Sequence, residues 1–196
     1  MARIDDFRAQ LTGGGARPSL FRVILMFPQT LPIPGATEAS KKAEFLVRAT
    51  SLPASRINTI EIPFRGRTTK LAGDRVFDNW GCTIMNDTDF AIRNALESWS
   101  ALIANHTSTV GVLTSAAYQT DMYVQQLDRN DRALKTYKFV NCFPVNISEI
   151  QLDAGASGQI EEFSVEFALD YWSAVDSTDV NQTGNILSVG RAIAGI

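Results

Sequence analysis

The most regular hydrophobic pattern lies near the end of the chain. Between residues 162 and 171, apolar side chains occupy every second position, namely Phe163, Val165, Phe167, Leu169 and Tyr171. The positions between them are polar or small: Glu162, Ser164, Glu166, Ala168 and Asp170. Alternation of this kind is typical of a strand with one buried and one solvated side. The sequence therefore predicts a strand whose wet face is acidic.

Helical periodicity is convincing in one stretch. Apolar side chains recur there at spacings of three and four: Ile92, Ala95, Leu96, Trp99, Leu102 and Ile103. The preceding Asn86-Asp87-Thr88 supplies side chains that cap helix N-termini. We expect an amphipathic helix from Thr88 to Asn105, with one apolar stripe that packs on a sheet.

Further strands are predicted from apolar, branched and aromatic runs that end at prolines and polar turns. They cover Ser19–Phe27, Glu44–Thr50, Asn58–Ile62, Val76–Asn86, Asp121–Asp128, Ala133–Asn141 and, after Pro144, Val145–Leu152. Two polar stretches, Gln29–Lys42 and His106–Gln119, are predicted as loops.

Three segments are expected to extend from this body. Phe64–Ala72 has basic side chains around Gly66 and little apolar content, which is typical of a projecting hairpin. Residues 1–18, with their glycine run at 13–15, are predicted as a flexible N-terminal arm, and residues 173–196 as a C-terminal extension. Residues 1–172, with the arm included, are predicted to be one mainly β domain: a β-barrel or two-sheet sandwich with one amphipathic α-helix packed on it.

Composition and charge exclude several classes of function. The net charge of −3 gives no basic surface of the kind that neutralises phosphates, which disfavours tight DNA binding. The chain has one histidine, His106, and two cysteines, Cys82 and Cys142, which we expect to be buried thiols. These residues are too few and too scattered to predict a metal site, a nucleophilic triad or a cofactor site. The sequence also predicts neither a signal peptide nor a membrane span, and no enzyme.

A collinear resemblance adds to this interpretation. The segments that carry it are Ala16–Val23, Phe45–Ala54, Ile62–Trp80, Thr83–Asp87, Phe143–Asp153 and Phe167–Trp172. In this order they resemble the tail tube proteins of contractile-tailed bacteriophages over about residues 1 to 172. The 29–42 loop is longer than the family's usual link, and residues 173–196 run past its usual end.

The resemblance implies a structural subunit that forms homohexameric rings, stacked into a hollow tube inside a contractile sheath. Neighbouring sheets would join into one continuous inner barrel. The tape-measure protein and DNA would pass through the lumen, with baseplate and tail terminator proteins at the ends. The tube would be assembled in the host cytoplasm and belong to the virion. A tube of a tailocin, a contractile injection system or type VI secretion is the nearest alternative. A β-sandwich module that binds carbohydrate is a more distant one, and an enzyme comes third.

The resemblance implies two sets of candidate residues, one for contacts and one for the lumen. The candidates for contacts between rings and subunits are Arg65, Arg67, Lys70, Asp74 and Arg75, assisted by Arg17 of the arm. A merely solvated hairpin is the alternative, because exposed charges contribute little energy. For the lumen they are Glu44, Arg48, Asn79, Thr83, Glu162, Ser164 and Glu166, whose sum is net negative. A single bulge would exchange the two faces of a strand and alter this second set.

Overall fold

The computed structural model describes residues 3–11, 15–108 and 110–175, and its elements are mainly strands. Within these residues the chain forms two compact units. One gathers the described residues up to Ile24 with residues 123–138 and 173–175, and the other contains residues 25–122 and 139–172. Two glycines of the 13–15 run, Gly13 and Gly14, and most of the predicted C-terminal extension, 176–196, lie outside the described residues.

The first unit is built on the pairing of β1 (Phe21–Ile24) with β6 (Thr120–Leu127), whose end lies in this unit. The two strands are antiparallel, and Val23 lies opposite Val124, both buried. A tight turn then leads into β7 (Ala133–Ile147), as expected from the polar residues 129–132. Helix α1 (Ile4–Gln10) lies within the predicted arm, and none of its residues is buried.

The second unit is organised by a sheet in the order β7-β8-β5-β2, with β9 (Tyr171–Val175) paired to β7. It contains β2 (Val47–Thr50), β5 (Trp80–Met85) and β8 (Glu162–Ala168), paired antiparallel. Across β5 and β8, three pairs of partners are all buried: Trp80 with Phe167, Cys82 with Val165, and Ile84 with Phe163. The predicted alternation in β8 is therefore confirmed, although the strand ends at Ala168.

Aromatic rings fill the core of this unit. Trp80 stacks on Phe139 and Phe167, with ring centroids 4.6 and 5.3 Å apart. Trp99, on helix α3 (Ala91–Ile103), reaches Phe167 at 6.3 Å and so packs the helix onto the sheet. The amphipathic helix and the mainly β class are confirmed. The helix begins at Ala91, three residues later than predicted. The Ala91 amide donates a hydrogen bond to Asp87 Oδ1 at 3.4 Å.

Two predicted loops contain helices. α2 (Ala36–Leu46) occupies part of the stretch expected to be an exposed loop, and it includes Glu44, which was expected in a strand. Its sequence is rich in Ala, Lys and Glu, which are strong helix formers. Ala39 and Ala43, one turn apart, are fully buried, and the helix packs against α3. The turn of helix α4 (Ser115–Tyr118) interrupts the second predicted loop, and its Tyr118 carbonyl accepts the Trp99 indole N–H at 2.9 Å.

The two strands predicted on either side of Pro144 are one strand, β7. Pro144 lies opposite Phe167, and the register shifts between Pro144 and Asn146. Proline lacks the amide hydrogen that a regular ladder needs, and a bulge is a position where a strand tolerates it. The proline therefore does not end β7, which continues to Ile147.

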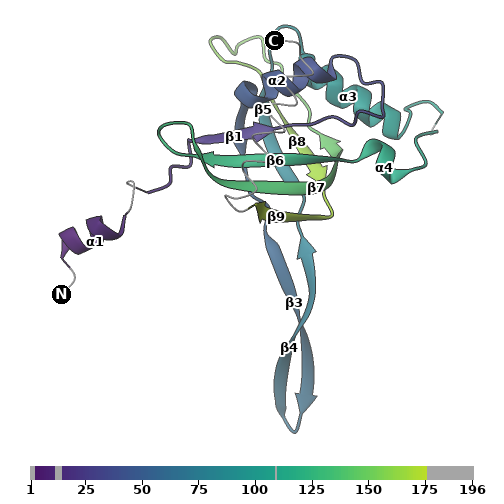
Figure 1. Ribbon diagram of the computed structural model, residues 1–196. Coiled ribbons are helices and arrows are strands. Elements are labelled where there is room, and N and C mark those ends of the chain that lie inside the picture. The colour runs from purple at the N-terminus through teal and green to yellow at the C-terminus, as the bar shows by residue number, and fades with distance from the viewer. Residues whose placement is uncertain (1–2, 12–14, 109, 176–196) are drawn as a thin grey trace. The chain divides into compact units, whose positions relative to one another are not determined.

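The predicted projecting hairpin is confirmed and is longer than expected. It consists of β3 (Ser55–Phe64) and β4 (Arg67–Phe77), which pair with each other and not with the larger sheet. It extends well beyond the other strands of its unit (Figure 1). Arg65 and Gly66 form its turn with φ of 47° and 79°, and two positive φ angles are the requirement of the turn that matches strand twist.

Candidate functional site

One exposed surface lies on the sheet of the second unit. We call it the polar face and define it as Arg48, Thr83, Glu162, Ser164 and Glu166. On β5 and β8 these residues alternate with the buried positions, and Thr83 lies opposite Ser164, with hydroxyl oxygens 3.4 Å apart. The structure therefore brings five of the seven predicted lumen residues onto one face of the sheet.

The other two predicted lumen residues lie elsewhere. Glu44 belongs to helix α2, so its assignment to the wet face of a strand is wrong. Asn79 is exposed, but it lies in the connection between β4 and β5, where the predicted single strand from Val76 to Asn86 is interrupted. Strand alternation does not apply in a helix, and α2 extends to Leu46, which explains the error at Glu44. The assignment of Asn79 to the lumen stays a prediction.

The charges of the polar face are paired in part. The Arg48 guanidinium forms an ion pair with the Glu162 carboxylate, and its Nη1 donates to Oε2 at 2.5 Å. The remaining charged residue of the face is Glu166, so the face is net negative by one charge. An open depression of about 420 Å³ lies on this face, where Thr83, Ser164 and Glu166 line it together with neighbours such as Thr50 and Gly81.

A second surface lies on the hairpin, where one side is apolar. We call it the apolar hairpin face and define it as Ile60, Ile62, Phe64 and Leu71. These side chains are 46% to 65% exposed. Ile60 lies opposite Leu71, whereas the alternate positions Glu61 and Lys70 form an ion pair on the other side at 3.3 Å. The alternation of Ile60, Ile62 and Phe64 was the signal for this face, and the charges of the segment concealed it.

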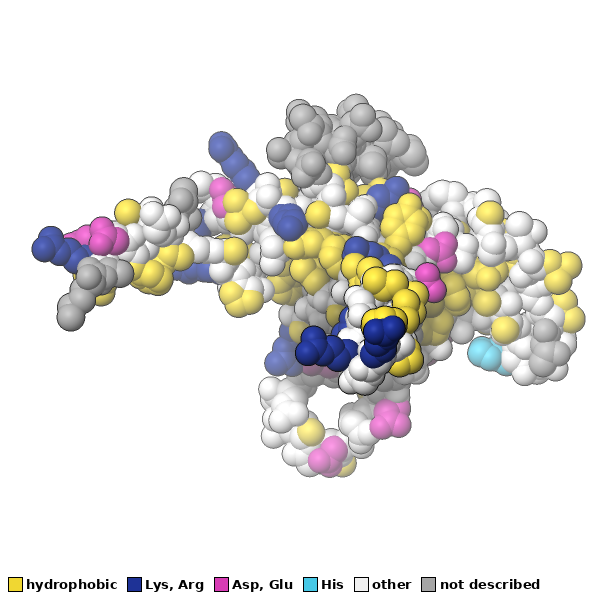
Figure 2. Space-filling model, turned by 90° about the horizontal axis from the view of Figure 1, so that it is seen from below, with side chains coloured by type: hydrophobic (Ala, Val, Ile, Leu, Met, Phe, Trp, Pro, Cys, Tyr) yellow, Lys and Arg dark blue, Asp and Glu magenta, His cyan; other side chains and the backbone are white. Residues whose placement is uncertain are grey.

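Five of the six residues predicted to contact other subunits lie on the hairpin: Arg65, Arg67, Lys70, Asp74 and Arg75. Arg65 stands in the turn with its guanidinium carbon 5.2 Å from the Phe64 ring centroid. Arg75 donates to the Ser55 hydroxyl at 2.8 Å. Seen from the tip of the hairpin, dark-blue basic and yellow apolar side chains stand together (Figure 2). Arg17 belongs to the other unit.

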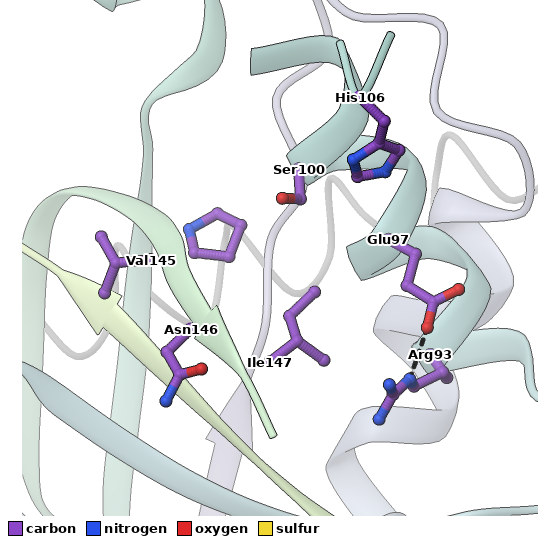
Figure 3. Close-up of a pocket in the computed structure, with 8 residues that line it drawn as sticks. Arg93, Glu97, Ser100, His106, Val145, Asn146 and Ile147 are labelled. Atoms are coloured by element: carbon purple, nitrogen blue, oxygen red, sulfur yellow. Dashed lines mark hydrogen bonds and ion pairs between the residues drawn. The ribbon is translucent and has the colours of Figure 1, made fainter. Parts of the chain in front are cut away.

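A groove of about 350 Å³ lies between α3 and β7 (Figure 3). Arg93, Glu97 and Ser100 face it from the helix, with His106 just beyond the helix end, and Val145, Asn146 and Ile147 face it from the strand. Arg93 donates to Glu97 at 2.6 Å and to the Ser148 carbonyl at 2.9 Å. These bonds hold the arginine in a structural role. His106 is exposed after the end of α3, as expected of a loop or helix-end residue.

Both cysteines are free and buried, as predicted. Burial raises the pKa of the Cys82 thiol to about 12, and burial also raises the pKa of Cys142 to about 12. A thiol must ionise to act as a nucleophile or to bind a metal. Neither cysteine is therefore set up for chemistry. None of the described helices has the length and apolar character that a membrane crossing needs.

Sequence comparisons identify relatives of this chain. A family model described as phage tail tube protein matches residues 16–175. Tail tube protein gp19 of Enterobacteria phage T4 is 32% identical over 171 residues, which cover 86% of this chain and 98% of the relative. The tail tube protein of Serratia phage KSP90 is 27% identical over 177 residues, covering 89% of this chain and 97% of the relative.

Structure comparisons show the same fold in contractile assemblies. A chain in the cryo-EM structure of the anti-feeding prophage cap has a TM-score of 0.61 at 15% identity, covering 83% of this chain and 92% of that one. A chain in the sheath-tube complex of the extracellular contractile injection system PVC has a TM-score of 0.58 at 14% identity, covering 85% and 96%. Since the family model spans most of the chain and the T4 relative aligns over nearly its whole length, this chain belongs to the phage tail tube protein family and is a structural component of the virion tail.

Proposed function

We propose that this chain forms homohexameric rings that stack into a hollow tube inside a contractile sheath, through which DNA passes into the host. The observation that carries this proposal is the apolar hairpin face. Four large apolar side chains stand about half exposed on a two-stranded ribbon that pairs with no other strand of the described chain. An isolated two-stranded hairpin is only marginally stable in water. A second copy of the chain is the partner that would cover this face in a tube.

The apolar face contributes more to this contact than the charges. Full burial of a large aliphatic or aromatic side chain stabilises by about 1.5–3 kcal/mol, and half of that burial remains available at each of these positions. An exposed ion pair contributes about 0–1 kcal/mol. We therefore assign the adhesion between copies to Ile60, Ile62, Phe64 and Leu71. The charged residues around them, Arg65, Arg67, Lys70, Asp74 and Arg75, set orientation, with Arg17 as a further contact.

The polar face is proposed to line the channel. Strand residues opposite the core must face solvent, and in a closed tube that solvent is either outside or in the lumen. Small hydroxyls and a net negative charge are suited to a wall past which a polyanion must slide, because like charges oppose adsorption. The proposed lining is the polar face with Asn79, and Glu44 is removed from the set because it lies on α2.

The proposed partners follow from the tube. The tail sheath protein surrounds it, the tape-measure protein and DNA occupy its lumen, and baseplate and tail terminator proteins close its ends. The related folds support this assignment, because they come from a sheath-tube complex and from a tube-terminating cap. As a tube subunit the chain is not an enzyme.

The experiment is assembly of the purified full chain, followed by size-exclusion chromatography and negative-stain microscopy. Rings or hollow tubes are expected. Ile62→Asp places a charge on the apolar hairpin face and should abolish them. Thr68→Asp is the matched control, since Thr68 is exposed opposite Pro63, on the other side of the same hairpin. A wild-type protein that stays monomeric, or equal assembly of both variants, contradicts the proposal. A tube map with the polar face outside contradicts the lumen assignment.

A further inference from the structure

We propose that Glu162 withholds the Arg48 guanidinium from the polyanion that moves along the polar face, so that the wall does not grip DNA. This inference rests on the proposed placement of the polar face in the channel. It assigns Glu162 the role of a positioning residue, which acts through Arg48 and touches no DNA itself. Glu166, the other carboxylate of the face, has no such role.

The geometry of Arg48 is built for this pairing. Arg48 lies in β2 and Glu162 in β8, and strand β5 runs between them. The register of β2 against β5 shifts between Val47, opposite Ile84, and Ala49, opposite Thr83. Arg48 is therefore the extra residue of a bulge, and a bulge re-aims the side chain that it carries. The re-aimed guanidinium reaches across β5, and its Nη1 donates to both oxygens of Glu162.

Without Glu162, the same residues would make a phosphate site. A guanidinium binds phosphate through charge-assisted hydrogen bonds, and hydroxyl groups add further donors. The hydroxyls of Thr83 and Ser164 belong to the same polar face. Arg48 remains 60% exposed, so solvent and phosphates can reach it. The paired Glu162 carboxylate keeps phosphates from binding Arg48, because it neutralises the charge of the guanidinium and occupies its hydrogen-bond donor.

Assembly would multiply the effect of this pair. Every subunit of a ring carries one Arg48 and one Glu162, so a ring without the carboxylate would present one cation per subunit to the DNA. Each phosphate that a protein neutralises steepens the salt dependence of binding by about 0.9 in log K against log salt. Unmasking Arg48 should therefore be visible in the salt dependence as well as in the affinity.

The test compares two variants that remove one carboxylate each from the same face. Glu162→Gln frees Arg48, whereas Glu166→Gln makes the same change in net charge and leaves the ion pair intact. The full-length protein is titrated against a fluorescein-labelled 30-base-pair duplex at low salt, and fluorescence anisotropy reports binding. We expect Glu162→Gln to tighten binding about fivefold or more, with a salt slope steeper by about 0.9 per arginine in contact, and Glu166→Gln to change it by less than about twofold.

A double variant completes the comparison. Arg48→Gln with Glu162→Gln removes the freed cation and should return the affinity to that of the wild type, whose net charge it shares. Equal gains in Glu162→Gln and Glu166→Gln would show that only net charge matters and would overturn the masking role. A lower melting temperature in Glu162→Gln with unchanged affinity would show a purely structural ion pair and would also overturn it.

The placement of the polar face is tested separately, by the rate of DNA ejection from particles. Particles with Glu162→Gln should eject more slowly than particles with Glu166→Gln. Tighter duplex binding in solution together with an unchanged ejection rate would contradict the lumen assignment and leave the masking of Arg48 supported. The masking of Arg48 is therefore tested by duplex binding, and the placement of the polar face in the lumen is tested by the ejection rate.

Discussion

The indole Nε1 of Trp80 donates a hydrogen bond to the hydroxyl oxygen of Thr50, 2.8 Å away. The Thr50 hydroxyl in turn donates a hydrogen bond to the Gly81 carbonyl at 3.1 Å, so one hydroxyl on the edge strand β2 satisfies two polar groups on β5. Trp80 is fully buried and stacks on two phenylalanine rings. The central aromatic residue of the core is thus held by a threonine on the neighbouring strand.

Replacing Thr50 by valine should lower the free energy of unfolding by about 1–3 kcal/mol, because a buried N–H loses its acceptor while the side-chain volume is kept. Urea unfolding followed by tryptophan fluorescence measures the change. Thr50→Ser retains the hydroxyl and should stay close to wild type. A valine variant as stable as wild type would show that the hydrogen bond contributes nothing.

The Lys42–Asp87 ion pair should make stability depend on pH in a definite direction. Lys42, on α2, lies 2.5 Å from Asp87, in the segment that leads into α3. The bond from Lys42 lowers the pKa of Asp87 below its usual 3.8, and the bond from Asp87 raises the pKa of Lys42 above its usual 10.5. The carboxylate's contribution is present above its unfolded pKa and is lost as pH falls through the folded one. The lysine's contribution is present below its unfolded pKa and is lost as pH rises through the folded one.

Asp87→Asn should therefore lower the urea midpoint at pH 7, and its difference from wild type should shrink below about pH 3.8. The measurement is a series of urea titrations from pH 2 to 8. Asp89→Asn is the matched control, because the Asp89 side chain is 74% exposed at 3.0 Å from the same lysine and should shift the midpoint less. A constant difference at all pH values would contradict the assignment to this ion pair.

Gly73 should be intolerant of larger side chains. A Cβ at this position would lie 2.9 Å from the Asn58 carbonyl oxygen and 3.2 Å from Ile60 Cγ1. Asn58 lies at the register shift between β3 and β4, and the atom that a Cβ would meet belongs to its backbone, which cannot rotate away as a flexible side chain could. Gly73→Val should distort the hairpin and reduce tube assembly, while near-ultraviolet circular dichroism of the tryptophan core stays unchanged. Ala72→Val, at an exposed neighbouring position, should assemble normally.

The two cysteines should not react in the folded protein. Cys82 and Cys142 are 2% and 0% exposed, and burial raises both thiol pKa values to about 12. At pH 8 the reactive thiolate is scarce and out of reach. Ellman's reagent should detect no thiol in the native chain and two in guanidinium chloride. Rapid labelling of native protein would reveal an opening of the core around β5 and β7.

Elements with an uninterrupted local pattern could be predicted from the sequence alone. The alternation of Phe163, Val165 and Phe167 specifies which side of β8 is buried, because successive side chains of a strand point to opposite faces. The apolar stripe of α3 was found on the same grounds, from its spacing of three and four. The β3-β4 hairpin was predicted from Gly66 and the basic residues around it, which is also local information. For the polar face, this local parity already selected Thr83, Glu162, Ser164 and Glu166.

Only the tertiary structure decided the rest, because the deciding contacts join residues far apart in the sequence. Helix α2 forms where Ala39 and Ala43 can pack closely against α3, and the prolines and glycine before it concealed that possibility. Pro144 remains inside β7 because a bulge accommodates it. The pairing of Arg48 with Glu162 spans 114 positions and depends on the bulge in β2 that aims the arginine across β5. The pattern of residues along the chain predicts which side of a single strand is buried. The order of the strands in the sheet determines which charged side chains of different strands lie close together.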